Sequence, residues 1–292
     1  RFSLNFLKIA EFLGDGFIYY TRREKSECLI DVFLLNLYYK GDCMRKPQNV
    51  YDNSQFFEEY QKMRDSKINA NELIEIPQIK AMMPDIKDKM ILDLGCGDGG
   101  MSRYFAENGA KRVLGLDISN NMIKLAKSKT QQANVEYIVG EMENISKLNE
   151  KFDIVFSSLA FHYVEDFEKL MADISGLLKP NGILLFSQEH PIATAIIPSN
   201  KDMKKYIEIN GKRYFLLSDY NNNSCRSLNW NIEGVIKYHR NFSSIINAII
   251  KSGMSVLQVG ESQADEKAVQ LVEKYKYQID RPYFLYIKAQ KV

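Results

Sequence analysis

Residues 90–100, which decide the fold, read Met90-Ile91-Leu92-Asp93-Leu94-Gly95-Cys96-Gly97-Asp98-Gly99-Gly100. The first half of this stretch is an apolar run long enough for one buried strand. The second half is rich in glycine and opens onto a helical pattern over residues 101–108. Glycines let the backbone pass close to a ligand, and a helix start offers unpaired N–H groups. A plain strand-to-helix turn needs one glycine rather than several, so the stretch predicts a site for a nucleotide-like ligand.

The glycine spacing by itself leaves two kinds of ligand open. Gly95, Gly97 and Gly100 satisfy the G-x-G-x-x-G pattern of dinucleotide-binding enzymes, so an NAD(P)-dependent oxidoreductase is one interpretation. Two carboxylates favour a cationic ligand instead, because Asp93 lies two positions before the first glycine and Asp98 lies within the loop. Carboxylates would repel a pyrophosphate, whereas they would attract a ligand that carries an ammonium and a sulfonium.

Strand and helix patterns alternate after the glycine loop. Strands are expected at residues 112–116, 135–139, 153–157 and 183–187, with helices at 119–129 and 165–178 between them. This alternation predicts an α/β fold with a doubly wound parallel sheet that is covered by helices on both faces. A helix at 243–251, a strand at 255–259, a helix at 266–275 and a strand at 283–289 close the chain.

Residues 188–238 interrupt the alternation. Asn210-Gly211 lies between two strand-like runs, 206–209 and 212–217, and predicts a β-hairpin. The rest of the segment is polar and is expected to be irregular. An insertion after a parallel strand lies at the carboxyl edge of the sheet, where ligands bind, so this one is expected on the substrate side.

The N-terminal part divides into two predicted regions. Residues 1–43 are expected to be an extension of unclear role, because their apolar run is too short to span a membrane and a natural start follows at Met44. Residues 44–89 are expected to form a helical lid ahead of the ligand-binding domain, 90–292. Within the lid, a helix over residues 51–64 would either turn Tyr60 and Arg64 toward the charged end of the ligand or only pin itself to the core through its aromatic residues.

Composition limits the partners of the protein. The 292 residues carry a formal net charge of +2, which argues against strong attraction to nucleic acid or anionic lipid. The four cysteines are scattered without a C-x-x-C pair, so no zinc site or disulfide framework is indicated. We expect free thiols, a cytoplasmic location, no bound metal and no membrane partner. The sequence does not indicate an oligomeric state.

Four motifs together resemble one enzyme family. The run Asp93-x-Gly95-x-Gly97-x-Gly99 resembles motif I of the class I S-adenosylmethionine-dependent methyltransferases. Asp117, residues 152–163 and residues 177–184 resemble the family's next motifs in the same order. The resemblance is closest to the type 11 group of small-molecule methyltransferases and extends over residues 50–292. It implies a Rossmann-like, seven-stranded methyltransferase sheet with an antiparallel last strand, and S-adenosylmethionine as cofactor with S-adenosylhomocysteine as product.

The cofactor-binding residues follow partly from position and partly from this resemblance. Asp117 ends the second strand, 20 residues beyond Gly97, where a carboxylate can accept hydrogen bonds from both hydroxyls of a ribose. The resemblance implies that Glu141 approaches the adenine amino group and that the Met142 N–H meets the ring. The full expected set is Tyr60, Arg64, Asp93, Gly95, Gly97, Gly99, Asp117, Ile118, Met122, Glu141, Met142 and Ser157.

The family reaction is an in-line displacement, in which an acceptor atom attacks the methyl carbon of the sulfonium. His162, His190 and His239 all follow elements that end at the carboxyl edge, so one of them is expected to be the base that takes the acceptor's proton. Aromatic residues in the insertion favour a small organic acceptor over a nucleic acid. A non-catalytic module that only binds S-adenosylmethionine remains a further interpretation.

Overall fold

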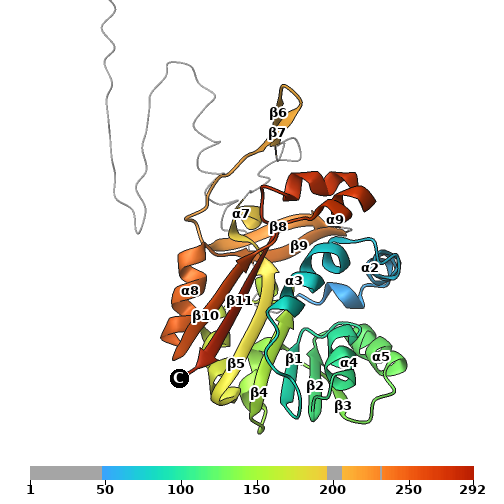
Figure 1. The fold of residues 1–292 in the computed structure, drawn as a ribbon, viewed down its shortest axis with the longest axis vertical. Helices are drawn as coiled ribbons and strands as arrows, with labels where there is room; N and C mark the ends of the chain where they lie inside the picture. Colours follow the sequence, from blue (N-terminus) through green and yellow to red (C-terminus); the bar gives the residue numbers. More distant parts are fainter. Residues whose placement is uncertain (1–47, 196–205, 231) are drawn as a thin grey trace, which may run out of the picture. The chain divides into compact units, whose positions relative to one another are not determined.

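A central sheet of seven strands organises the computed structural model, which describes residues 48–195, 206–230 and 232–292 (Figure 1). The expected extension at residues 1–43 lies outside the described residues. The strand order is β10-β11-β5-β4-β1-β2-β3. The bounds are β1 (Met90–Leu94), β2 (Arg112–Asp117), β3 (Val135–Val139), β4 (Phe152–Ser158), β5 (Leu178–Glu189), β10 (Met254–Glu261) and β11 (Phe284–Lys291). Only β11 runs antiparallel to its neighbours, which confirms the expected sheet.

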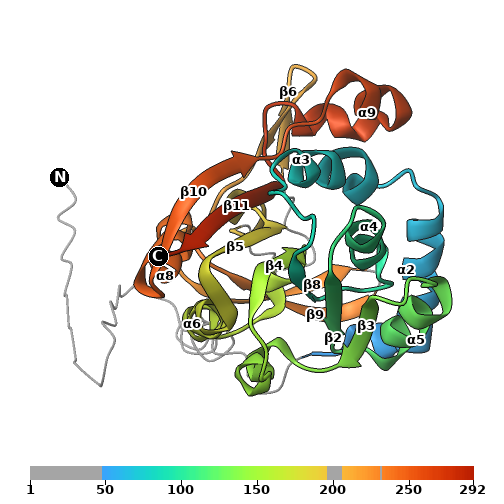
Figure 2. The same ribbon diagram turned by 60° about the horizontal axis from the view of Figure 1, so that its bottom comes forward.

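Helices cover both faces of this sheet, as the alternating pattern predicts (Figure 2). In β1, Leu92 and Leu94 pack in one apolar cluster while Ile91 packs in another, because successive side chains of a strand point to opposite faces. The first cluster includes α6 (Phe167–Leu177) and α8 (Phe242–Lys251). The second includes α3 (Ile76–Ala81) and α4 (Gly100–Glu107), and α5 (Asn120–Lys129) packs against β2 and β3.

Local capping signals determine where several helices begin. The Asn53 side chain accepts from Phe56 N at the start of α2 (Ser54–Asp65), and Ser119 Oγ accepts from Met122 N at the start of α5. A 3₁₀ turn, η1 (Val50–Asp52), precedes α2, and a π-helical turn, η2 (Asn71–Glu75), precedes α3. The N-terminal helices therefore form as expected; whether they act as a lid stays a prediction.

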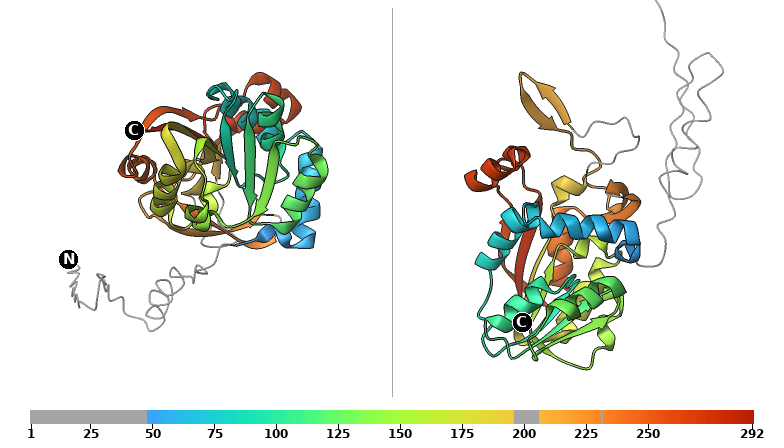
Figure 3. Two further views of the ribbon diagram at one scale, coloured as in Figure 1. Left: turned by 90° about the horizontal axis from the view of Figure 1, so that it is seen from below. Right: turned by 90° about the vertical axis from the view of Figure 1, so that its right-hand side faces the viewer.

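The insertion is more regular than its sequence suggests. The predicted hairpin is present as β6 (Tyr206–Ile209) and β7 (Lys212–Phe215), and it projects from the body of the domain (Figure 3). The expectation of irregular structure in the rest is wrong, because β8 (Ser224–Trp230) and β9 (Ile232–His239) pair as a second antiparallel ribbon. Val235 of β9 packs with Val50 and Phe56 from the N-terminal helices, a distant contact that local patterning cannot reveal. A short helix, α7 (Pro191–Thr194), follows β5.

β10 is joined to β11 by α9 (Glu266–Leu271), η5 (Glu273–Gln278) and the loop that follows. The 3₁₀ turns η3 (Met142–Lys147) and η4 (Phe161–Tyr163) flank β4.

Cys96 is a buried free thiol as expected, whereas Cys225 is disulfide-bonded, so the expectation of free thiols is wrong for that residue. Every helix in the described part of the chain is too short or too polar to cross a lipid bilayer.

Candidate functional site

The glycine loop between β1 and α4 combines packing constraints with one open position. Gly95, Gly97 and Gly99 all have positive φ angles, of 69°, 54° and 76°. A Cβ on Gly95 would lie 2.5 Å from Ala160 Cβ, and a Cβ on Gly99 would lie 2.2 Å from Tyr137 Oη. A Cβ on Gly97 would meet no atom within 4 Å. Tight packing therefore requires two of the glycines, while Gly97 borders open space that a ligand can approach.

That open space is a cavity of about 660 Å³ at the carboxyl edge of the sheet. The glycine loop, α2, the ends of β2, β4 and β5, the β8–β9 ribbon and the loop before β11 all contribute to its walls. The volume lies within the range typical of small-molecule sites. Most of the expected cofactor-binding residues line it, including Tyr60, Arg64, Asp93, Asp117, Ile118, Met122 and Met142.

Asp117 is positioned by two backbone N–H groups beside the open glycine. Its Oδ2 accepts from Gly97 N and its Oδ1 accepts from Ser119 N, both at 2.9 Å. Burial raises the pKa of this carboxyl, and the two hydrogen bonds partly offset that effect. Because each carboxylate oxygen can accept more than one hydrogen bond, Asp117 retains acceptor capacity toward the cavity. This is the capacity that recognition of two ribose hydroxyls requires.

Opposite charges line the cavity near the glycine loop, where Arg64 and Asp98 interact electrostatically. Asp93 is buried and accepts from Ser102 Oγ at 2.6 Å, and burial raises its pKa to about 7. Arg64 reaches this region from α2, and its Nη1 is buried without a hydrogen-bond partner. Its Nη2 lies 3.7 Å from Glu72 Oε1. A group that carries both an ammonium and a carboxylate would satisfy Asp93 and the unpaired nitrogen of Arg64 together.

Three expected cofactor-binding residues, Gly99, Glu141 and Ser157, do not line the cavity. Glu141 instead accepts from Asn144 Nδ2 at 2.7 Å, and the buried Ser157 Oγ donates to Leu94 O at 2.8 Å. Glu143, two positions beyond Glu141, is a cavity residue that the sequence did not single out. Glu141 is the N-cap of the 3₁₀ turn that begins at Met142, and Glu143 lies within that turn, a difference that a motif match cannot resolve.

The three histidines do not meet at one site. Only His162 lines the cavity. His190 accepts from Ile192 N and pairs with Glu261 Oε1 at 2.8 Å, while His239 pairs with Thr194 Oγ1 at 2.7 Å and with Tyr220 O at 2.9 Å. Both rings are buried with both nitrogens engaged. The side chains of His190 and His239 bond to neighbouring elements and do not line the cavity, so the expected role as base is open to His162 alone.

His162 lies beside a buried ion pair. Lys237 Nζ contacts Glu189 Oε1 at 2.5 Å, and both side chains line the cavity. The backbone N–H of Glu189 donates to His162 Nδ1 at 3.4 Å, which leaves the proton of the neutral ring on Nε2. Burial lowers the pKa of His162 to about 3, and the Glu189 charge offsets this only in part. The ring is therefore neutral at physiological pH and can offer an N–H donor.

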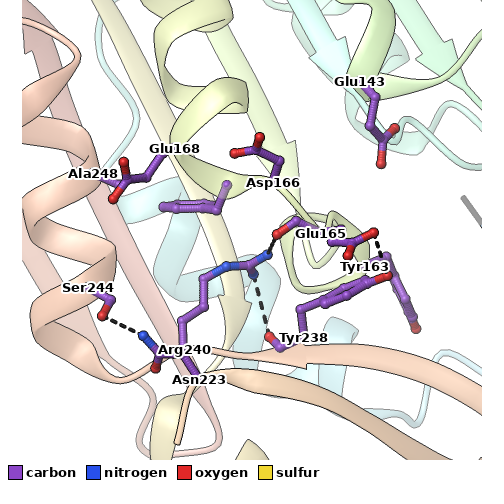
Figure 4. Close-up of a pocket in the computed structure, with 11 residues that line it drawn as sticks. Glu143, Tyr163, Glu165, Asp166, Glu168, Asn223, Tyr238, Arg240, Ser244 and Ala248 are labelled. Atoms are coloured by element: carbon purple, nitrogen blue, oxygen red, sulfur yellow. Dashed lines mark hydrogen bonds between the residues drawn. The ribbon is translucent and has the colours of Figure 1, made fainter. Parts of the chain in front are cut away.

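A second cavity of about 620 Å³ shares Glu143 and Tyr163 with the first (Figure 4). The close-up shows Arg240 extended across it, with dashed hydrogen bonds to backbone oxygens. Arg240 donates to the carbonyls of Val164, Glu165 and Tyr238, so its donors serve to hold η4 and β9 together.

In the described ranges no group of three or more His, Cys, Asp or Glu side chains is arranged to hold a metal ion.

Comparison with known proteins decides the family. The solved S-adenosylmethionine-dependent methyltransferase of Mesorhizobium loti is 31% identical, with a TM-score of 0.68 over 76% of this chain and 98% of that one. This chain belongs to the class I S-adenosylmethionine-dependent methyltransferases. The family model described as a methyltransferase domain matches residues 92–186, and the type 11 resemblance is thereby confirmed.

Two sequence relatives show how far the methyltransferase assignment reaches. An uncharacterized protein of Haemophilus influenzae is 36% identical over 258 residues, which cover 85% of this methyltransferase and 99% of the relative. The malonyl-[acyl-carrier protein] O-methyltransferase of Hamiltonella defensa is 36% identical over only 106 residues, 36% of this chain and 40% of that enzyme. The likeness to that enzyme covers only about a third of this chain, so its acceptor does not transfer to this chain.

Proposed function

We propose that this methyltransferase moves the methyl group of S-adenosylmethionine to a small organic acceptor that is enclosed in the same cavity. The observation that carries the proposal is the continuity of that cavity, which is lined by Gly97 and Asp117 at one end and by His162 and Lys237 at the other. A cofactor held at the first end would meet an acceptor held at the second. The cofactor supplies an activated methyl group on a sulfonium.

The residues of the cofactor end fit that molecule. Asp117 would accept from the two ribose hydroxyls, and Ile118 and Met122 would flank the adenine as apolar walls. Arg64 would receive the carboxylate of the methionine part, because one of its buried nitrogens has no other partner. Asp93 would receive the ammonium.

Alignment and exclusion of water are the main contributions expected from the protein. Holding two reactants in line contributes roughly 7–11 kcal/mol of barrier reduction in well-oriented systems. The buried rings of Phe56 and Tyr163 and the paired charges of Glu189 and Lys237 would fix the walls around the acceptor. The Nε2–H of His162 is suited to donate to an acceptor oxygen, so we infer that His162 orients the acceptor rather than removing its proton.

Calorimetry with S-adenosylhomocysteine tests the cofactor assignment. Asp117→Ala is expected to weaken binding at least about tenfold, since hydrogen bonds to a charged group contribute roughly 1.5–3 kcal/mol each. Glu107→Ala, which removes an exposed carboxylate outside the cavity, serves as the control and should bind like wild type. Equal binding by Asp117→Ala and wild type would contradict the ribose assignment.

Transfer itself needs a separate measurement. A panel of small acceptors with methyl-labelled S-adenosylmethionine should yield at least one labelled product. If the protein binds the cofactor but labels no acceptor, the interpretation as a non-catalytic binding module is favoured instead.

A further inference from the structure

Charged side chains line both ends of the main cavity. Asp93, Asp98 and Asp117 lie around the glycine loop, where the cofactor is proposed to bind. Arg281 and Lys274 line the same cavity from the loop before β11 and from η5. The first end therefore offers carboxylates together with Arg64, and the second end adds the positive charges of Arg281 and Lys274 beside the Glu189–Lys237 pair.

The positively charged side chain of Arg281 has no anionic partner among the described residues. Among the residues that the structure describes, it forms no hydrogen bond and no ion pair, and its Nε is buried without a partner. Its guanidinium lies 4.1 Å from the ring centroid of Phe215, another cavity residue. Burial lowers the pKa of Arg281, and no carboxylate offsets that cost. A partly desolvated charge of this kind is unfavourable until an oxyanion binds it.

Apart from Arg64, which is assigned above to the cofactor, three other cations in or near the cavity already have partners. Lys237 is paired with Glu189, and Arg240 donates to three backbone carbonyls. Arg213, on the same hairpin as Phe215, is paired with Glu208 at 3.6 Å and does not line the cavity. Arg281 thus differs from these three cations in having no hydrogen-bond or ion-pair partner among the described residues, only the ring of Phe215.

The fold brings Arg281 to the acceptor end. β11 runs antiparallel to β5, and Phe284 pairs with Glu189 in the register. His190 N donates to Tyr283 O at 2.9 Å, so the loop that carries Arg281 lies against the end of β5. Phe215, Tyr163 and Tyr283 add flat apolar surface to this end of the cavity.

We propose that the methyl acceptor is a small organic anion with a flat apolar body, and that the planar fork of Arg281 binds its oxyanion. This inference rests on the proposed function. A guanidinium recognises a carboxylate or a phosphate through two parallel hydrogen bonds, so the shared chemistry is a planar pair of oxyanion oxygens. The aromatic side chains would hold the body of the acceptor between Arg281 and the cofactor.

The test uses the full chain saturated with S-adenosylhomocysteine. Benzoate, phenyl phosphate and the neutral benzamide are titrated by calorimetry into wild type, Arg281→Met and the matched control Arg213→Met. Benzoate or phenyl phosphate should bind to wild type and to Arg213→Met, and benzamide should bind at least about tenfold more weakly. Arg281→Met should lose roughly 10- to 100-fold in anion affinity. The better of the two anions identifies carboxylate or phosphate as the acceptor's group.

Failure of this inference can be told apart from failure of the proposed function. If wild type does not bind S-adenosylhomocysteine, the proposed function itself is wrong. If that ligand binds but the anions bind no better than benzamide, or Arg281→Met binds them like wild type, only the anion inference is overturned. Arg281→Lys covers the case in which Arg281→Met does not fold, because it keeps the charge but loses the fork and should bind anions with intermediate affinity.

Discussion

Gly97 and Asp117 are joined by a hydrogen bond of 2.9 Å from the glycine N–H to the aspartate Oδ2. This bond ties the loop after β1 to the end of β2, so the two motif residues form one rigid surface. Since a Cβ on Gly97 would meet no protein atom, the surface is shaped for a ligand rather than for packing.

Two substitutions in the glycine loop should affect different properties: one the stability of the fold, the other mainly the binding of the ligand. Gly99→Ala should destabilise the fold by about 2–4 kcal/mol, because its Cβ would lie 2.2 Å from Tyr137 Oη and its φ is positive. Gly97→Ala should cost only the backbone strain, about 1–2 kcal/mol, but abolish binding of S-adenosylhomocysteine. Thermal unfolding and calorimetry on both variants check this. Retained binding by Gly97→Ala would show that the ligand does not approach that glycine.

Two buried carboxyls should contribute a loss of stability as pH rises from about 4 to about 7, whereas the buried histidines, whose pKa values are lowered, contribute a gain over the lower part of that window. Burial raises the pKa of both Asp93 and Glu75 to about 7, so the folded state retains protons that the unfolded state has lost in this window. The melting temperature of Asp93→Asn relative to wild type should therefore rise between pH 5 and pH 7.5, because the variant lacks the Asp93 contribution. A difference that stays constant over this window would contradict the pKa direction of Asp93.

Ligand affinity should show the opposite trend. An ammonium beside Asp93 favours the ionised carboxylate, so binding of S-adenosylhomocysteine should strengthen as pH rises through 7. Calorimetry at several pH values measures this, with Asp93→Asn as the variant in which the dependence should disappear. A dependence that persists in Asp93→Asn would assign it to another group.

The histidines should divide into two kinds by their effects. His239→Ala should destabilise the fold by about 1–3 kcal/mol, since it leaves Thr194 Oγ1 and Tyr220 O without their partner. His162→Ala should change turnover and KM for the acceptor while the affinity for S-adenosylhomocysteine is kept. Unfolding curves and steady-state kinetics on the same preparations distinguish the two. Normal turnover in His162→Ala would remove it from the reaction.

The Glu189–Lys237 pair should respond strongly to the loss of one partner. Both side chains are largely buried, at 12% and 7% exposure. Lys237→Met leaves a buried carboxylate without its cation and should cost about 3–5 kcal/mol of unfolding free energy. The double variant Lys237→Met, Glu189→Gln should recover much of that loss. Equal stability of the single and double variants would show that the pair is not coupled.

The spacing of residues in the sequence predicts those structural features that form between residues close together in the chain. The strand–glycine–helix unit and the Asn210-Gly211 hairpin each form within a few residues, so the sequence predicts them. The cofactor end follows as well, because the carboxyl ends of parallel strands meet at one edge. That rule brings Asp93 and Asp117 together.

Tertiary structure decided which side chains at that edge face the ligand. His162, His190 and His239 share the edge, but hydrogen bonds to Glu261, Thr194 and Tyr220 turn two of them away. Arg281 has no motif around it, and only the antiparallel register of β11 on β5 carries it to the cavity. By itself the sequence determined the fold and the cofactor end, because local spacing and strand direction specify them. The acceptor end depends on contacts between residues far apart in the chain, and only the folded protein establishes those.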